Sequence, residues 1–134
     1  MSISMQTPTT IHQSRLTEIA QTEKILADLE GGRKAVSTYI AYLVKMLGED
    51  TEKLWEQGYI QNKDLSEMIV LHPTMVATDK IMFLDFLVQD SDYANSITAY
   101  RSILKNQKRK MKEFSKKTVL KEALRDYLGS DNLG

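Results

Sequence analysis

Cysteine is absent from the sequence, so the chain can form no disulfide bond and carry no thiol chemistry, and its redox compartment stays undetermined. Histidine is also scarce, because His12 and His72 are the two in the chain and stand in different predicted elements. A zinc site needs about four clustered ligands, and nucleophilic catalysis needs a base beside the nucleophile. We therefore expect a protein that is not an enzyme, with no catalytic residue, no metal, no cofactor and no small-molecule substrate.

Long apolar runs are absent as well. No stretch approaches the roughly 20 apolar residues that cross a bilayer, so we expect no membrane partner. The opening residues, MSISMQTPTT, have neither the basic nor the apolar region of a secretory signal. The expected localisation is cytoplasmic.

What the sequence does contain is helical periodicity. Apolar residues recur at spacings of three, four and seven, and sustained period-two alternation is missing. The length of 134 residues suits one domain. We predict an all-α fold, a small compact helical bundle of six or seven helices. The bundle occupies residues 10–128, after a flexible N-terminal segment at residues 1–9 and before a frayed tail at residues 129–134.

Glycine, proline and capping residues set the expected helix ends. Glycine takes the left-handed cap conformation without steric cost, and the residue before proline avoids the α region. A capping box at Thr10 and Gln13 and a similar pair at Asp64 and Glu67 predict two helix starts. The helix over residues 33–47 is apolar nearly all round, so we expect it to be central and buried on several sides. The predicted breaks are Gly31-Gly32, Gly48, Gly58, His72-Pro73 and Asp90-Ser91-Asp92.

A long basic amphipathic helix is predicted near the C-terminus. Its apolar face recurs at Tyr93, Ile97, Tyr100, Leu104 and Met111, within a band about 60° wide at 100° per residue. Basic residues follow a second band, about a quarter-turn away. This basic stripe consists of Arg101, Lys105, Lys108, Arg109, Lys112 and Lys116.

The apolar face changes position after Lys117. Residues 119–128 place their apolar side chains roughly 150° from the earlier band. Either the helix breaks near Ser115 and a separate final helix follows, which we favour, or one helix turns a different face to a different neighbour. We expect Gly129 to end the final helix.

Charge is divided unevenly along the chain. Residues 1–100 carry 8 Lys/Arg and 14 Asp/Glu, residues 101–128 carry 10 Lys/Arg and 3 Asp/Glu, and the whole chain is neutral. Such asymmetry indicates an acidic or polyanionic partner. The basic stripe is either a solvated or protein-docking surface, or a rail for nucleic-acid phosphates, with other anions as a further alternative.

Acidic residues crowd the start of a short predicted helix, at Glu49, Asp50, Glu52 and Glu56. They either complement the helix dipole or form a docking patch for a basic surface, such as the basic stripe of another subunit. We therefore predict a non-enzymatic protein-interaction module, a small adaptor, regulator or assembly factor that self-associates as a homo-oligomer. The alternative is a nucleic-acid-binding protein that uses the basic stripe.

Overall fold

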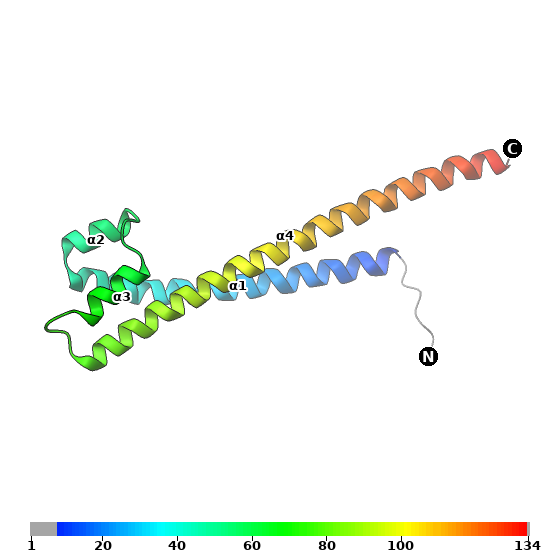
Figure 1. The fold of residues 1–134 in the computed structure, drawn as a ribbon. Coiled ribbons are helices and arrows are strands. Elements are labelled where there is room, and N and C mark those ends of the chain that lie inside the picture. Colours follow the sequence, from blue (N-terminus) through cyan, green and yellow to red (C-terminus); the bar gives the residue numbers. More distant parts are fainter. Residues whose placement is uncertain (1–7, 134) are drawn as a thin grey trace, which may run out of the picture. The chain divides into compact units, whose positions relative to one another are not determined.

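The chain is helical throughout its regular structure, in the part that the structure describes. The structure is a computed structural model, and it describes residues 8–133, except for the side chains of residues 8, 9, 126 and 129–133. Four helices follow one another: α1 at Pro8–Leu47, α2 at Glu49–Glu56, α3 at Asn62–Val70 and α4 at Ala77–Leu133 (Figure 1). The all-α prediction is confirmed, and the predicted number of six or seven helices is wrong. Most of the predicted flexible segment, and residue 134 of the predicted tail, lie outside the described residues.

Two compact units divide the chain. Unit 1 combines residues 1–25 with residues 100–134, and unit 2 is the continuous stretch of residues 26–99. Since α1 and α4 each extend through both ranges, each unit is built on one segment of α1 and one segment of α4. The helices α2 and α3 belong wholly to unit 2.

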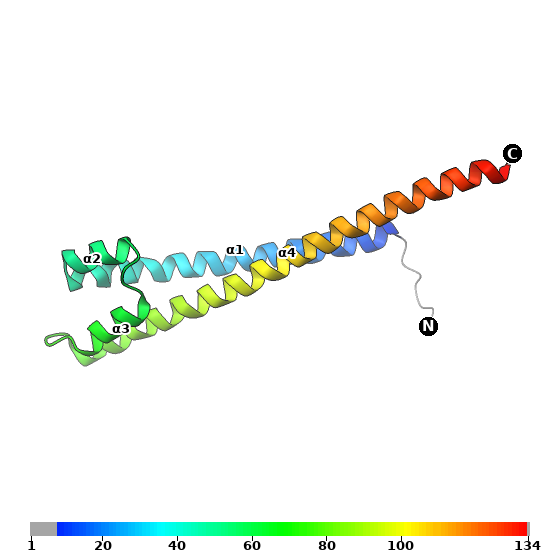
Figure 2. The ribbon, with the colours of Figure 1, turned by 45° about the horizontal axis from the view of Figure 1, so that its top comes forward.

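The core of unit 2 lies where its α1 and α4 segments meet α2 and α3. In both views α2 and α3 lie at the end of this unit where α1 stops and α4 starts (Figures 1 and 2). The largest fully buried side chains are Leu43, Val44, Leu65 and Ile69. The other buried members of the cluster are Val36, Ile40, Ile60, Phe83 and Leu87. The predicted central position of residues 33–47 is therefore confirmed for one side of that helix.

A neighbouring side of the same α1 segment is open to solvent. Tyr39, Tyr42 and Met46 are 54%, 62% and 50% exposed. The expectation that residues 33–47 are buried on several sides is therefore wrong, because α2, α3 and α4 together cover only part of this apolar helix.

Three of the predicted breaks are confirmed. Gly48 separates α1 from α2 with a φ of 122°, and Gly58 follows α2 with a φ of 81°. Both values lie in the region that glycine adopts most readily. Pro73 stands between the end of α3 and the start of α4, where the restricted residue before it interrupts the helix.

The other predicted breaks are wrong. The helix α1 continues through Gly31-Gly32, and α4 continues through Asp90-Ser91-Asp92, through Ser115 and past Gly129. A glycine costs a helix about 1 kcal/mol and a serine or aspartate less. Packing along a partner helix supplies most helical stability in proteins, so it can override such local costs.

Two predicted helix starts also differ from the structure. The helix α1 begins at Pro8, before Thr10, and proline is favourable in a first turn because its missing N–H would be unpaired there in any case. The helix α3 begins at Asn62, where the backbone N–H of Gln61 donates to Asp64 Oδ2 at 2.9 Å. Asp64 is therefore the residue that reaches back to the cap, rather than the cap of a pair with Glu67.

In unit 1, Arg15 of α1 contacts α4 in two ways. Arg15 Nη1 donates to the carbonyl oxygen of Lys110 at 3.0 Å, and its guanidinium carbon lies 4.9 Å from the centroid of the Phe114 ring. Ile19 and Thr22 are the buried residues of the α1 segment in this unit. A cation over an aromatic face contributes about 0.5–1 kcal/mol at an exposed site.

Gly32 leaves room for the ring of Tyr93, which lies against α1. A Cβ atom at position 32 would lie 2.7 Å from Tyr93 Cζ, whereas a Cβ at Gly31 would meet nothing within 4 Å. We expect Gly31→Ala to raise the free energy of unfolding by about 0.5–1 kcal/mol, the usual cost of a helical glycine. Gly32→Ala should give no such gain, because the ring must move. Urea unfolding followed by circular dichroism compares the two variants, and equal stabilisation would contradict the packing of Tyr93.

Candidate functional site

The basic stripe lies on α4, in unit 1. All six of its side chains are exposed, and they follow the helix instead of surrounding a cavity. Lys112 and Lys116 also border a shallow apolar depression with Val119, Leu120 and Ala123. A row of exposed cations can contact an extended anionic surface, but it offers no enclosed site for a small molecule.

The predicted acidic docking patch lies on α2. Glu49, Asp50 and Glu52 stand in its first turn, as the helix-dipole explanation requires, and Glu52 is half-buried. Glu49 pairs with Lys53 one turn later, at 3.6 Å and with both side chains exposed. Exposed pairs of this kind contribute at most a few tenths of a kcal/mol. Docking by this patch stays a prediction.

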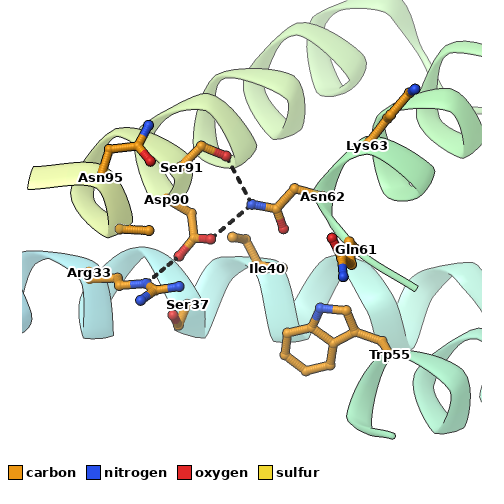
Figure 3. A pocket seen from close by; sticks show the side chains of 11 residues that line it. Arg33, Ser37, Ile40, Trp55, Gln61, Asn62, Lys63, Asp90, Ser91 and Asn95 are labelled. Carbon is orange, nitrogen blue, oxygen red and sulfur yellow. Dashed lines mark hydrogen bonds and ion pairs between the residues drawn. The ribbon is translucent and has the colours of Figure 1, made fainter. Parts of the chain in front are cut away.

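A polar pocket of about 530 Å³ opens in unit 2 between α1, α3 and α4 (Figure 3). Asp90 lies at its centre and is 8% exposed, although it is charged. Arg33 Nε donates to Asp90 Oδ1 at 3.2 Å, and Asn62 Nδ2 donates to Asp90 Oδ2 at 2.9 Å. The same Asn62 nitrogen lies 3.2 Å from Ser91 Oγ. One carboxylate therefore joins three helices.

This network has the form of a structural clamp. Both oxygens of Asp90 accept hydrogen bonds, and a buried carboxylate needs such partners to remain stable in the protein interior. The sequence pattern does not reveal this role, because Asp90-Ser91-Asp92 predicts a helix break. Nothing in the local pattern names a partner 57 residues away. The sequence could have indicated this role of Asp90 only if the helix had been predicted to continue through it.

The two histidines do not form a catalytic pair. His72 Nδ1 accepts hydrogen bonds from the backbone N–H groups of Met75 and Thr74, at 3.0 and 3.3 Å. It therefore closes the turn around Pro73. His12 is half-buried in α1. Among the described residues, no group of three or more His, Cys, Asp or Glu side chains could hold a metal ion.

An exposed apolar face on unit 2 was not foreseen as a site. We call it the aromatic face, and it consists of Tyr39, Tyr42, Met46, Met82 and Phe86. The rings of Tyr39 and Phe86 are stacked, with centroids 4.6 Å apart and an interplanar angle of 1°. Met46 follows Tyr39 by seven residues and Met82 precedes Phe86 by four, so each helix contributes one row. The signal in the sequence was a helix more apolar than one core can bury.

A second exposed apolar surface lies on α4 in unit 1. We call it the terminal apolar stripe, and it consists of Val119, Leu120, Leu124, Tyr127 and Leu128. These side chains are between 52% and 69% exposed. Their helix is the continuation of the one that carries the basic stripe, so the favoured break near Ser115 is wrong and the helix is continuous. The different neighbour that the other alternative required is not seen, because these side chains are exposed.

Comparison with known proteins adds no relative. No family model matches the chain, and neither a curated protein nor a solved structure is significantly similar to it. Within the described residues, no helix is both long enough and apolar enough to cross a membrane.

Proposed function

We propose that this protein is a non-enzymatic interaction module that associates with itself. The observation that carries the proposal is the exposure of two apolar surfaces, the aromatic face on unit 2 and the terminal apolar stripe on unit 1. Contiguous exposed apolar surfaces of this kind usually mark protein interaction sites. Aromatic residues and methionine are also enriched at protein interfaces.

The distribution of charge supports association between copies. Unit 1 carries 12 Lys/Arg and 6 Asp/Glu, a net charge of +6, and unit 2 carries 6 Lys/Arg and 12 Asp/Glu, a net charge of −6. Unit 1 of one copy and unit 2 of another therefore attract one another. Such attraction speeds encounter and fixes orientation more than it raises affinity.

Sedimentation velocity at several concentrations and two salt concentrations tests the proposal. At tens of micromolar we expect a weight-average mass above the 15.3 kDa of one chain. We expect this mass to fall between about 50 and 500 mM salt, because screening weakens attraction between exposed charges. A chain that stays at 15.3 kDa under all these conditions would refute self-association.

Nucleic-acid binding is the second candidate, and the exposure of the whole basic stripe favours it. If all six cations contact phosphates, the slope of log affinity against log salt is about −5. Reversing charge at Lys105, Arg109 and Lys112 then abolishes binding, as measured by fluorescence anisotropy of labelled duplex DNA and single-stranded RNA. The matched control reverses three exposed lysines of unit 2, Lys34, Lys45 and Lys63. No binding by the wild-type chain at low salt rules this candidate out.

A further inference from the structure

We infer that the aromatic face of one copy binds the terminal apolar stripe of a second copy. The inference rests on the proposed self-association, and it names the two surfaces that meet. Four observations support it: the two-helix construction of the aromatic face, the spacing of the stripe, the matching length of the two surfaces and the opposite net charges of the two units.

The aromatic face is built from two neighbouring helix segments. It is made by two helix segments that lie side by side, since Tyr39 of α1 stacks on Phe86 of α4. Ile40, next to Tyr39, lines the polar pocket with Asn62 of α3, so α3 covers another side of this pair. Tyr42 and Met82 are 62% and 45% exposed on the uncovered side. An amphipathic helix is a common ligand for an apolar surface formed by two helices.

The terminal apolar stripe has the spacing that such a ligand needs. Leu120, Leu124, Tyr127 and Leu128 stand at i, i+4, i+7 and i+8, which places them along one side of the helix. All four are more than half exposed. Their spacing gives a row of anchors suited to a surface that contains flexible methionine side chains.

The two surfaces have similar lengths. At a rise of 1.5 Å per residue, Leu120 and Leu128 are about 12 Å apart along α4. Tyr39 and Met46 are about 10 Å apart along α1 by the same measure. Two turns of the stripe can therefore cover the full length of the aromatic face.

Charge favours a second copy as the occupant of the aromatic face. Asp85 is exposed and follows Met82 by three residues, and Lys45 is exposed and follows Tyr42 by three residues, so charges of both signs border the face. Lys117 and Lys121 are exposed and stand seven residues before Leu124 and Leu128, so both lie along the stripe. The face belongs to a unit of net charge −6 and the stripe to a unit of net charge +6, so a second copy fits the face better than an anionic polymer does.

The contact joins two different surfaces, so it is heterologous. Such contacts extend into rings or open chains unless two of them close a symmetric pair. Because the two surfaces differ, two variants that each lack one surface can still bind one another. A contact between identical surfaces would give no such mixed dimer.

The test uses two full-length variants and their mixture in sedimentation velocity. The face variant carries Met46→Glu and Met82→Glu, and the stripe variant carries Leu120→Glu and Leu124→Glu; all four side chains are at least 45% exposed. We expect each variant alone to associate at least tenfold more weakly than wild type. An equimolar mixture should form a mixed dimer, because each variant retains the surface that the other has lost.

The control carries Ile81→Glu and Val88→Glu. These residues are 68% and 58% exposed in the same unit, but their helical positions place them away from Met82 and Phe86. We expect the control to associate like wild type, and circular dichroism to show native helicity in every variant. A face variant that associates normally, or a mixture that stays monomeric, overturns the inference while leaving self-association intact. A monomeric wild-type chain removes the proposed function as well.

Cysteine crosslinking gives an independent result if a glutamate variant fails to fold. Because the chain has no cysteine, an introduced cysteine is the single thiol of its variant. A Met46→Cys chain mixed with a Leu124→Cys chain should form a disulfide-linked mixed dimer under mild oxidation. An Ile81→Cys chain mixed with the same Leu124→Cys chain should not. Equal crosslinking of the two mixtures overturns the inference.

Discussion

Leu65→Ala should lower the free energy of unfolding by about 3 kcal/mol, within the 2–5 kcal/mol found for truncation of a buried leucine. Leu65 is fully buried in the core of unit 2, at the start of the short helix α3. Removing three carbon atoms loses their transfer free energy and leaves a cavity that the neighbouring helices cannot fill completely. Since α3 has nine residues, it depends on packing more than on its own helical propensity.

The matched control is Leu71→Ala. Leu71 directly follows α3 and is 78% exposed, so the same substitution should change the free energy by no more than about 0.5 kcal/mol. Urea unfolding monitored by circular dichroism and by the fluorescence of Trp55, which packs against this core, gives both values. Similar losses for the two leucines would mean that α3 does not anchor the core.

The fold class followed from the sequence because periodicity reports it directly. Apolar spacing identified helices, and glycines with positive φ and a proline marked the true ends at Gly48, Gly58 and Pro73. Gly31-Gly32 also predicted a helix end, but α1 continues through it. There the missing side chain makes room for the Tyr93 ring, a long-range contact that no local rule contains.

Contacts between residues distant in sequence also explain why α4 continues where breaks were predicted. Asp90-Ser91-Asp92 and Ser115 are weak helix formers, and each predicts a break in the helix. In the folded chain Asp90 is a buried partner of Arg33 and Asn62, and Ser115 is half-buried within an uninterrupted helix. Local propensity alone could not predict either, because the compensation comes from residues distant in sequence.

The candidate surfaces were predictable only in part. The changed apolar face after Lys117 was visible as a shift in helical phase, and it became the terminal apolar stripe. The aromatic face was hidden in a helix that was apolar nearly all round, because periodicity cannot tell which apolar positions lack a partner. Tyr39 is exposed and the adjacent Ile40 is buried, and this difference depends on where α2 and α3 pack.

Arg33→Ala should destabilise the protein more than Asp90→Ala does. The Asp90 side chain is 12% exposed, and without Arg33 its charge stays in the interior with one hydrogen-bond donor from Asn62. We expect a loss of about 2 kcal/mol, less than for a fully buried pair because Arg33 is partly solvated. The Arg33 side chain is 43% exposed, so after Asp90→Ala it can turn toward water, at a cost of about 1 kcal/mol.

The double variant decides whether charge is the reason for this asymmetry. Arg33→Ala combined with Asp90→Leu removes both charges and fills part of the space, so it should recover stability relative to Arg33→Ala alone. Urea unfolding of Arg33→Ala, of Asp90→Leu alone and of the double variant gives the coupling between the two residues. Simple addition of the losses would show that the two side chains stabilise their helices independently. A positive coupling would instead identify the buried carboxylate as the group that makes Arg33 necessary, and hence as the clamp that holds α1 and α3 against α4.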